Sequence, residues 1–317
     1  LDELSIVLYF RTPSSALNPE AEKAFASNIF SVTRQVHFAD GDQSVDMVLC
    51  VNGLPLVSFE LKNPWTGQTW KNAIRQYQKT RDPKLPLFNF GRCLVHFALD
   101  INEAYMTTEL AGEDTYFLPF NRGHNHGKGN PVFPGSHRTA YMWREVLPKR
   151  SLAEIIERFV KLVEEEAQET GKTVKRLIFP RYHQLDSVRQ LVVAARKDGV
   201  GRRYLVQHSA GSGKSNSIAW LAFQLAELFD ATGEKAVFDS VVIVTDRIAL
   251  DDQLGRNVKN FAELSKLVQS TEKGSWQLRA ALDAGKKIII TTLQKFPHVA
   301  GEITQLADRR FAVIIDE

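Results

Sequence analysis

Residues 208–215 read His-Ser-Ala-Gly-Ser-Gly-Lys-Ser, a composition suited to binding phosphate. The apolar stretch 204–207 before them predicts a strand, and the residues after them predict a helix. Glycines let backbone N–H groups turn toward phosphate oxygens, and the helix N-terminus adds positive charge. We expect Lys214 to reach the β- and γ-phosphates of ATP and Ser215 to hold Mg²⁺. The loop residues predicted to bind ATP are Gly211, Ser212, Gly213, Lys214 and Ser215.

Two acids follow the apolar stretch 311–315 about a hundred residues later. An acidic pair after a strand is common, and a solvated strand end is the simplest interpretation of such a pair taken alone. Beside a phosphate-binding loop, however, the pair predicts an ATPase centre. We expect Asp316 to hold the Mg²⁺ of ATP and Glu317 to orient the attacking water as a catalytic residue.

Three further segments are similar to motifs of superfamily 2 helicase-type motors. Residues 242–254 resemble the motif after the phosphate loop, and residues 290–295 resemble the strand motif that touches the DNA backbone. Residues 179–184 resemble the motif that reads adenine, which predicts Gln184 as an ATP-binding residue. Each segment is weak evidence alone, and their order and spacing together favour a motor lobe.

A second candidate centre consists of Asp46, Glu60 and Lys62, which lie on two predicted strands, 45–51 and 56–61. Glu60 and Lys62 face the same way on an extended strand. The hairpin loop then decides whether Asp46 joins them. A two-residue loop at Asn52-Gly53 would turn Asp46 away, whereas a three-residue loop over 52–54 would place both acids on one face. We expect the three-residue loop.

Two carboxylates and a lysine on one face suit hydrolysis at a Mg²⁺ ion. Asp46, Glu60 and the main-chain carbonyl of Leu61 are expected to bind the metal through oxygen, the donor that hard cations prefer. Lys62 would orient the water or offset charge in the transition state. The alternative is an exposed acid–base face without a catalytic role.

The length and composition indicate two globular domains. The chain has 317 residues, 44% hydrophobic and 24% charged, with a net charge of +3, which permits a nucleic-acid partner without indicating one. We expect a first domain over 1–148, a helical linker over 149–180 and an ATPase lobe over 181–317. The linker prediction depends on apolar residues that recur at helical spacing from 151 to about 170.

The expected fold class is α/β. In the first domain, helices are predicted over 20–29 and 70–80 beside the two strands, with more strand over 87–99 and a long loop over 119–137. In the second, strands at 204–207, 239–244, 287–292 and 311–315 alternate with helices, which predicts a parallel sheet. Basic residues on and beside the helix over 70–80 could follow DNA phosphates or form a solvated face: Lys62, Lys71, Arg75, Lys79 and Arg81.

Other features bear on the cellular setting. The two cysteines are too few for a disulfide framework, which favours a reducing cytoplasm. The sequence has no apolar run of about 18 residues, so no membrane span is predicted. The chain opens without Met and ends on a buried-looking strand with two acids. We therefore expect it to be a fragment of a longer polypeptide.

The residues from Asp46 to Asn63, with Asn-Gly-Leu-Pro-Leu-Val followed by Glu-Leu-Lys, resemble the nuclease centre of the restriction (R, or HsdR) subunit of type I restriction enzymes. Residues 119–123 and 180–184 also resemble that family, as does the phosphate loop with His208 at its start. The resemblance spans roughly residues 20–317. It implies a PD-(D/E)xK endonuclease fold followed by a RecA-like P-loop lobe.

The chain departs from the family pattern at the helix after the nuclease strand. The family carries Gln-x-x-x-Tyr there, as an auxiliary nuclease motif. Tyr77 matches the tyrosine, but Ala73 stands at the glutamine position. Either Gln76 substitutes for that glutamine or the alignment shifts by a helical turn. Val45 stands at the position before the first acid, where the family usually has a proline.

The resemblance implies a motor and nuclease subunit that translocates duplex DNA with ATP and cleaves it with Mg²⁺. The implied partners are double-stranded DNA and the methylation and specificity subunits of a type I system, in a prokaryotic cytoplasm and without a membrane. The alternative is an ATP-dependent, helicase-like DNA remodeller whose first domain binds DNA without cutting it. Metal-dependent cleavage that is lost with Glu60 or Lys62 would distinguish the two.

Overall fold

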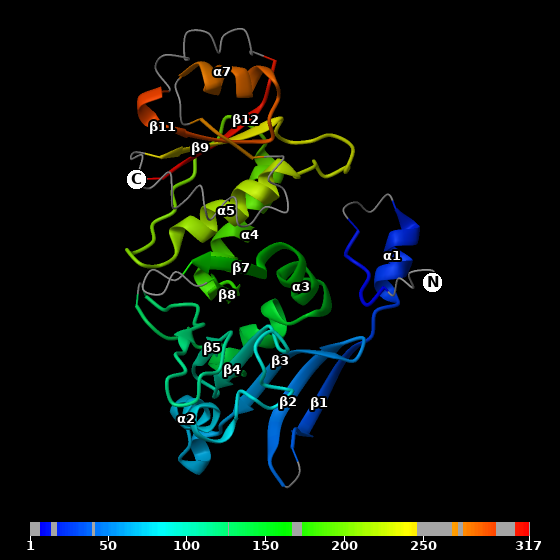
Figure 1. Cartoon of the computed structure of the whole chain (residues 1–317), viewed down its shortest axis with the longest axis vertical. Coiled ribbons are helices and arrows are strands. Elements are labelled where there is room, and N and C mark those ends of the chain that lie inside the picture. Colours follow the sequence, from blue (N-terminus) through cyan, green and yellow to red (C-terminus); the bar gives the residue numbers. More distant parts are fainter. Residues whose placement is uncertain are drawn as a thin grey trace. The chain divides into compact units, whose positions relative to one another are not determined.

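The computed structural model describes residues 7–13, 18–39, 42–125, 127–166, 173–245, 268–271, 275–295 and 308–316 (Figure 1). The chain divides into two compact units, Leu1–His183 and Gln184–Glu317. The first unit contains the segment 149–180, for which the sequence predicts a linker. Among the described residues, no helix is both long and apolar enough to cross a membrane.

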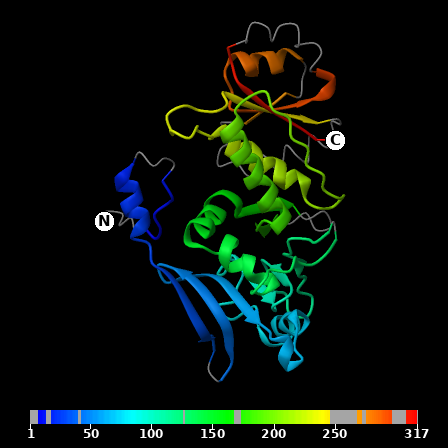
Figure 2. The ribbon, with the colours of Figure 1, turned by 180° about the vertical axis from the view of Figure 1, so that it is seen from behind.

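A six-stranded mixed sheet forms the centre of the first unit. Its strands lie in sequence order, and only β3 and β4 are parallel neighbours. The long hairpin of β1 and β2 and the neighbouring β3 are seen from both sides in Figures 1 and 2. The strands are β1 (Phe30–His37), β2 (Ser44–Val51), β3 (Leu54–Leu61), β4 (Val95–Leu99), β5 (Ala104–Thr107) and β6 (Leu118–Pro119).

The β2–β3 hairpin has the two-residue turn, so the three-residue loop expected from the sequence is wrong. Asn52 (φ 51°) and Gly53 (φ 82°) both take the left-handed backbone that such a turn requires, and Val51 pairs with Leu54. A β-bulge then adds one residue, Leu56, to β3, because Cys50 pairs with Pro55 while Leu49 pairs with Val57. The extra residue shifts the register by one, so both acids still reach one face.

Two helices belong to the first half of this unit. Helix α1 spans Pro19–Ala26 and α2 spans Trp70–Thr80, with the 3₁₀ turn η1 (Pro64–Thr66) between β3 and α2. Ala73 and Tyr77, four residues apart on α2, are both fully buried and pack with Val45 and Val48 of β2 in one core cluster. The helix therefore covers the strands that carry the acids.

The rest of the first unit departs from the predicted helical linker. Helix α3 (Lys149–Glu154) continues as the π-helical turn η4 (Ile155–Phe159), and the helix ends there. Beyond it, β7 (Lys161–Glu166) pairs antiparallel with β8 (Thr173–Ile178), so the predicted helix over 151–170 is wrong for residues 161–166, and residues 167–170 lie outside the described residues. Two further short turns precede α3, η2 (Arg138–Ala140) and η3 (Met142–Val146).

Burial and cross-strand pairing show why these residues form strands. Leu162 is 55% exposed while Val163 is buried, an alternation that belongs to a strand. Glu164 forms an ion pair with its cross-strand partner Lys175 at 3.5 Å. The apolar positions at 159, 160, 162 and 163 fit either period, and pairing with β8 decides in favour of the strand.

The second unit contains a four-stranded, wholly parallel sheet in the order β10-β11-β9-β12, as the alternating pattern predicts. Helix α7 lies on one face of this sheet and α5 on the other (Figures 1 and 2). All residues of β9 and β11 are buried, as expected for strands covered on both faces. The elements are α4 (Tyr182–Asp198), α5 (Lys214–Ala226), β9 (Ser240–Thr245), β10 (Val268–Ser270), α7 (Ser275–Asp283), β11 (Ile288–Thr292), η5 (Leu293–Lys295) and β12 (Phe311–Ile315).

The strand predicted at 204–207 is absent. These residues have no strand pairing among the described residues, and Leu205 is 93% exposed. Apolar character alone does not make a strand, because the backbone groups need a hydrogen-bonding neighbour. The predicted motor residues 246–254 and Glu317 lie outside the described residues.

A buried polar trio links the sheet to α2. The Ser58 hydroxyl lies 2.8 Å from the Tyr77 hydroxyl and 2.7 Å from His96 Nδ1. All three side chains are buried. Burial lowers the pKa of His96 from 6.5 to about 3, because the interior disfavours the charged imidazolium. His96 is therefore neutral in the folded state at any physiological pH.

This buried imidazole should make the first unit sensitive to acid. The folded-state pKa lies below the unfolded value, so the stabilisation is fully present above pH 6.5 and is lost as the pH falls toward 3. We expect the wild-type free energy of unfolding to fall relative to that of His96→Gln by up to ~1.4 kcal/mol per pH unit in this window. Urea titrations between pH 7.5 and 4 measure it. Parallel pH curves for the two proteins would contradict it.

Candidate active sites

The structure brings the predicted acids and lysine of the first unit together. The ammonium Nζ of Lys62 lies 3.8 Å from Asp46 Oδ2 and 3.9 Å from Glu60 Oε2. Glu60 is fully buried, whereas the side chain of Asp46 is 23% exposed and that of Lys62 is 13% exposed. The three groups thus form one centre that is open to solvent on the Asp46 side.

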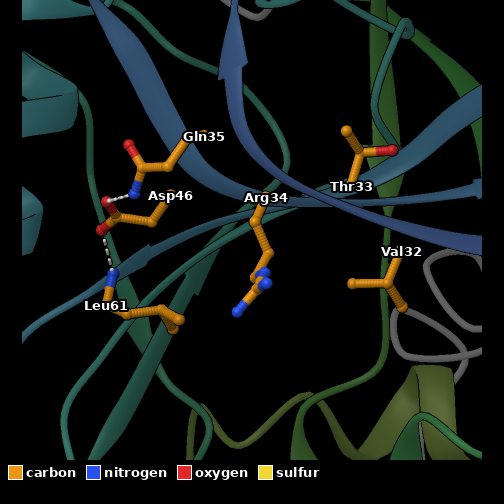
Figure 3. Close-up of a pocket in the computed structure, with 6 residues that line it drawn as sticks. All are labelled: Val32, Thr33, Arg34, Gln35, Asp46 and Leu61. Carbon is orange, nitrogen blue, oxygen red and sulfur yellow. Dashed lines mark hydrogen bonds between the residues drawn. The ribbon is translucent and has the colours of Figure 1, made fainter.

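Neighbouring groups hold Asp46 in place. The backbone N–H of Leu61 donates to Asp46 Oδ2 at 2.8 Å, and the Gln35 amide donates to Oδ1 at 3.3 Å (Figure 3). Gln35 has φ 51° in the middle of β1, a left-handed conformation that few non-glycine residues adopt. Its amide oxygen accepts from the Ser44 hydroxyl at 2.7 Å, so both ends of the amide are used.

A pocket opens beside Asp46 on the β1 side of the sheet. It is lined by Val32, Thr33, Arg34, Gln35, Asp46 and Leu61. Figure 3 shows the side chains of Arg34 and Asp46 among those that line it. The pocket therefore carries one cationic group, the Arg34 guanidinium, and one anionic group, the Asp46 carboxylate, and it is open to solvent.

Arg81 contributes to the centre in a way that differs from the sequence-based expectation. It is only 4% exposed and forms an ion pair with Glu60 Oε1 at 2.7 Å. Its side chain is therefore buried behind the acids and does not lie on a DNA-facing or solvated surface. Nothing in the local sequence indicates this pairing, because the tertiary fold alone brings the residue after α2 against β3.

Burial dominates the electrostatics of Glu60. Burial is the largest cause that raises the pKa of Glu60; Arg81 and Lys62 lower this pKa, the negative charge of Asp46 raises it, and the net pKa is about 7 against an ordinary 4.5. Carboxyls with raised pKa values are common at catalytic centres, where burial serves the chemistry at a cost in stability.

The oxygen atoms of this centre fit a hard divalent cation. Glu60 Oε2 is buried and accepts no hydrogen bond, which is costly for a carboxylate oxygen unless a cation binds it. Asp46 adds a second, partly exposed carboxylate within reach of the same lysine. Carboxylate oxygens are the ligands that Mg²⁺ prefers. The role of the Leu61 carbonyl stays a prediction.

The residues considered for the auxiliary motif lie in different surroundings on α2. Tyr77 is buried and bonds to Ser58, and Ala73 faces the same core, one turn earlier. Gln76 lies one residue from Tyr77, about 100° around the helix, and is partly exposed. The substitution of Gln76 for the family's glutamine stays a prediction.

The phosphate loop leads directly into α5, which begins at Lys214, with Ser215 in its first turn. Gly211 (φ 72°) and Gly213 (φ 81°) have left-handed backbones that side chains disfavour, as the sequence predicts. Ser212 is buried between them. The pKa of His208 is lowered by partial burial and by the nearby Lys214 charge.

Gln184 lies against this loop. Its amide Nε2 donates to the backbone carbonyls of Gly213 at 2.9 Å and Ser212 at 3.3 Å, and the side chain is 3% exposed. Asp316 follows β12, and its backbone N–H donates to the Val244 carbonyl of β9 at 2.9 Å. Both lie at the places that the motifs predict, and their roles toward ATP stay predictions.

Comparison with known proteins agrees with this division. Residues 17–115 match the family described as "Type I restriction enzyme R protein N terminus", and residues 183–317 match the "SWI2/SNF2 ATPase" family. The first unit thus has a restriction-endonuclease-like mixed sheet, and the second is a RecA-like P-loop ATPase lobe.

Individual similar proteins have more specific names than these families. The chain is 28% identical over 268 residues to the "Type I restriction enzyme HindI endonuclease subunit" of Haemophilus influenzae, covering 81% of the chain and 24% of that protein. It is 25% identical over 302 residues to the SauCOLORF180P endonuclease subunit of Staphylococcus aureus, covering 93% and 29%. The chain is homologous to the endonuclease subunits of type I restriction enzymes and spans about a quarter of their length.

A solved structure also resembles the chain. It is the fragment structure of a putative HsdR subunit of a type I restriction enzyme from Vibrio vulnificus, 16% identical with a TM-score of 0.34. The alignment covers 90% of this chain and 46% of that one.

Two glycines test how much the phosphate loop depends on its backbone. Gly53 and Gly213 have nearly equal φ, but a Cβ at 213 would lie 2.5 Å from Gln184 Nε2, while a Cβ at 53 would meet nothing. Gly53→Ala should cost about 1 kcal/mol of stability through backbone strain. Gly213→Ala should cost more and weaken binding of a fluorescent ATP analogue at least about tenfold, a change of ~1.4 kcal/mol.

The extra loss of stability in Gly213→Ala compared with Gly53→Ala is expected to come from the contact with Gln184. Adding Gln184→Ala to Gly213→Ala removes the collision, so the double variant should lose less than the sum of the two single changes. Thermal unfolding and analogue titration of the wild type, Gly213→Ala, Gln184→Ala and the double variant measure this. Additive losses would show that Gln184 does not shape the loop.

Proposed function

We propose that the chain is the nuclease domain and first motor lobe of a type I restriction endonuclease subunit, which translocates duplex DNA with ATP and cleaves it with Mg²⁺. The observation that carries the nuclease part is that one lysine ammonium lies within 4 Å of two carboxylates on adjacent strands. The matches to endonuclease subunits of type I restriction enzymes support the same assignment.

In this proposal Asp46, Glu60 Oε2 and the Leu61 carbonyl hold the nuclease Mg²⁺. The bound metal supplies positive charge that acidifies a water and stabilises the negative charge that develops on the phosphate. Lys62 Nζ lies within 4 Å of both carboxylates, and in this proposal it orients the attacking water and offsets charge on the phosphodiester. In the same proposal Arg34, which lines the adjoining pocket, contacts a DNA phosphate.

The second unit supplies the motor step. The backbone of Gly211, Ser212 and Gly213 surrounds the phosphates of ATP, Lys214 contacts the β- and γ-phosphates, and Ser215 holds the Mg²⁺ of the nucleotide. Asp316 completes that metal site, and Glu317 orients the hydrolytic water. Gln184 supports the loop through its two carbonyl contacts and lies beside the expected nucleotide.

The proposed partners follow from the assignment to a type I system. Double-stranded DNA is the substrate, and methylation and specificity subunits select the recognition site, in the cytoplasm of a prokaryotic cell. Tracking along DNA suits a lobe that recognises backbone phosphate, a contact that carries no sequence information.

Two single substitutions should separate the activities in the complete subunit assembled with its partner subunits. Lys62→Ala removes the water-orienting ammonium, so cleavage should fall at least about a hundredfold while DNA-dependent ATP hydrolysis persists. Lys214→Ala removes the charge that meets the phosphates, so ATP hydrolysis and translocation should both disappear. Steady-state ATPase and plasmid cleavage assays on both variants measure this.

The control is Lys175→Ala, an exposed lysine on β8 that should leave both activities unchanged. Lys214→Ala should also stop cleavage, because the cut depends on translocation. If Lys62→Ala cleaves DNA at the normal rate, the nuclease assignment is wrong and the DNA remodeller without cleavage is favoured. Normal cleavage by Lys214→Ala without ATP would show that the two activities are uncoupled.

A further inference from the structure

Arg81 makes an unusually complete set of contacts for a buried arginine. Its Nε and Nη2 converge on Glu60 Oε1, with the hydrogen bond from Nε at 2.8 Å and the Nη2 ion pair at 2.7 Å. Nη2 also donates to the Ser44 carbonyl at 2.8 Å, and Nη1 donates to the Thr80 hydroxyl at 3.1 Å. The guanidinium lies 4.9 Å from the centre of the Phe38 ring.

These contacts connect the two strands that carry the acids. Ser44 is the first residue of β2, two residues before Asp46, and Glu60 is near the end of β3. The rigid, planar guanidinium therefore bonds to both strands close to the three residues of the centre. A guanidinium is suited to this task because its donors are fixed in one plane and it stays charged at all relevant pH values.

The same contacts decide which oxygen of Glu60 faces the centre. A carboxylate rotates easily about its last side-chain bond, and either oxygen could then turn toward Asp46. Because Arg81 binds Oε1, Oε2 is left as the buried oxygen that accepts no hydrogen bond and lies 3.9 Å from Lys62 Nζ. Glu60 is thereby presented with one oxygen directed at the centre.

We propose that Arg81 is the positioning residue of the nuclease centre, which locks Glu60 so that Oε2 alone binds the divalent cation and ties this acid to the strand of Asp46. The inference rests on the proposed function. Arg81 contacts neither the cation nor the DNA in this arrangement, and its effect passes through Glu60. The cation affinity of the centre is then the property that Arg81 controls.

The test compares Arg81→Met, which keeps the length but removes every donor, with Arg81→Lys, which keeps the charge but loses the fork. The matched control is Arg122→Met. Arg122 also pairs with a glutamate, Glu145, and lies over the aromatic rings of Phe133 and Tyr182 in the same unit, but it has no contact with Glu60. Asp46→Asn in the same protein sets the level of Mn²⁺ binding outside the centre.

Two measurements are made on the complete subunit: Mn²⁺ affinity without nucleotide, by electron paramagnetic resonance, and the Mg²⁺ concentration that gives half-maximal cleavage in the assembled enzyme. Partners behind metal ligands typically affect affinity by about 10- to 100-fold. Arg81→Met should weaken Mn²⁺ binding by at least about tenfold and raise the Mg²⁺ requirement by a similar factor. Arg81→Lys should fall between it and the wild type, with ATPase unchanged in all variants.

Wild-type Mn²⁺ affinity and Mg²⁺ dependence in Arg81→Met would overturn the inference while leaving the proposed function intact. An equal loss of Mn²⁺ affinity in Arg122→Met would also overturn it, because the effect would then be a general loss of stability. If Arg81→Met does not fold, as judged by circular dichroism and ATPase, Arg81→Lys decides by the same criteria. A wild-type protein that neither binds Mn²⁺ above the Asp46→Asn level nor cleaves DNA would refute the inference and the proposed function together.

Discussion

The pairing register of β2 and β3 is the constraint on which the candidate nuclease centre depends. The left-handed turn at Asn52-Gly53 pairs Val51 with Leu54 and would by itself turn the two acids to opposite faces. The single extra residue Leu56 reverses this, because a shift of one residue moves every later side chain of the strand to the other face. A bulge beside an active site commonly redirects a side chain in this way.

The charges of the centre are balanced by burial and by specific partners. Removing Glu60 from water raises its pKa, and the nearby cations lower it, so that the net pKa is about 7. Lys62 on the open side and Arg81 on the buried side supply that charge. The two cations differ in freedom, because Arg81 is fixed by its contacts while Lys62 approaches the acids at nearly 4 Å.

The candidate site of the second unit is built mainly from backbone geometry, whereas that of the first unit is built from side chains. Its phosphate loop depends on two left-handed glycines and on the amide of Gln184, which bonds to the loop from the buried side. The parallel sheet places Asp316 at the carboxyl end of β12, beside β9, which is the usual position of ligand-binding residues in α/β sheets. Both candidate sites lie in one polypeptide, which is homologous to endonuclease subunits of type I restriction enzymes.

The sequence by itself determined the parts whose signal is local. Neighbouring residues indicate the hairpin at Asn52-Gly53, though not the length of its loop, and they also indicate the helix over 70–80, the strand at 311–315 and the glycines of the phosphate loop. Tertiary pairing alone decided that Leu56 forms a bulge, that residues 161–166 pair with 173–178 as antiparallel strands, and that residues 204–207 form no strand. The position of Arg81 against Glu60 is of the second kind, because an ion pair between residues 21 positions apart leaves no periodic trace along the chain and forms only when α2 packs on the sheet.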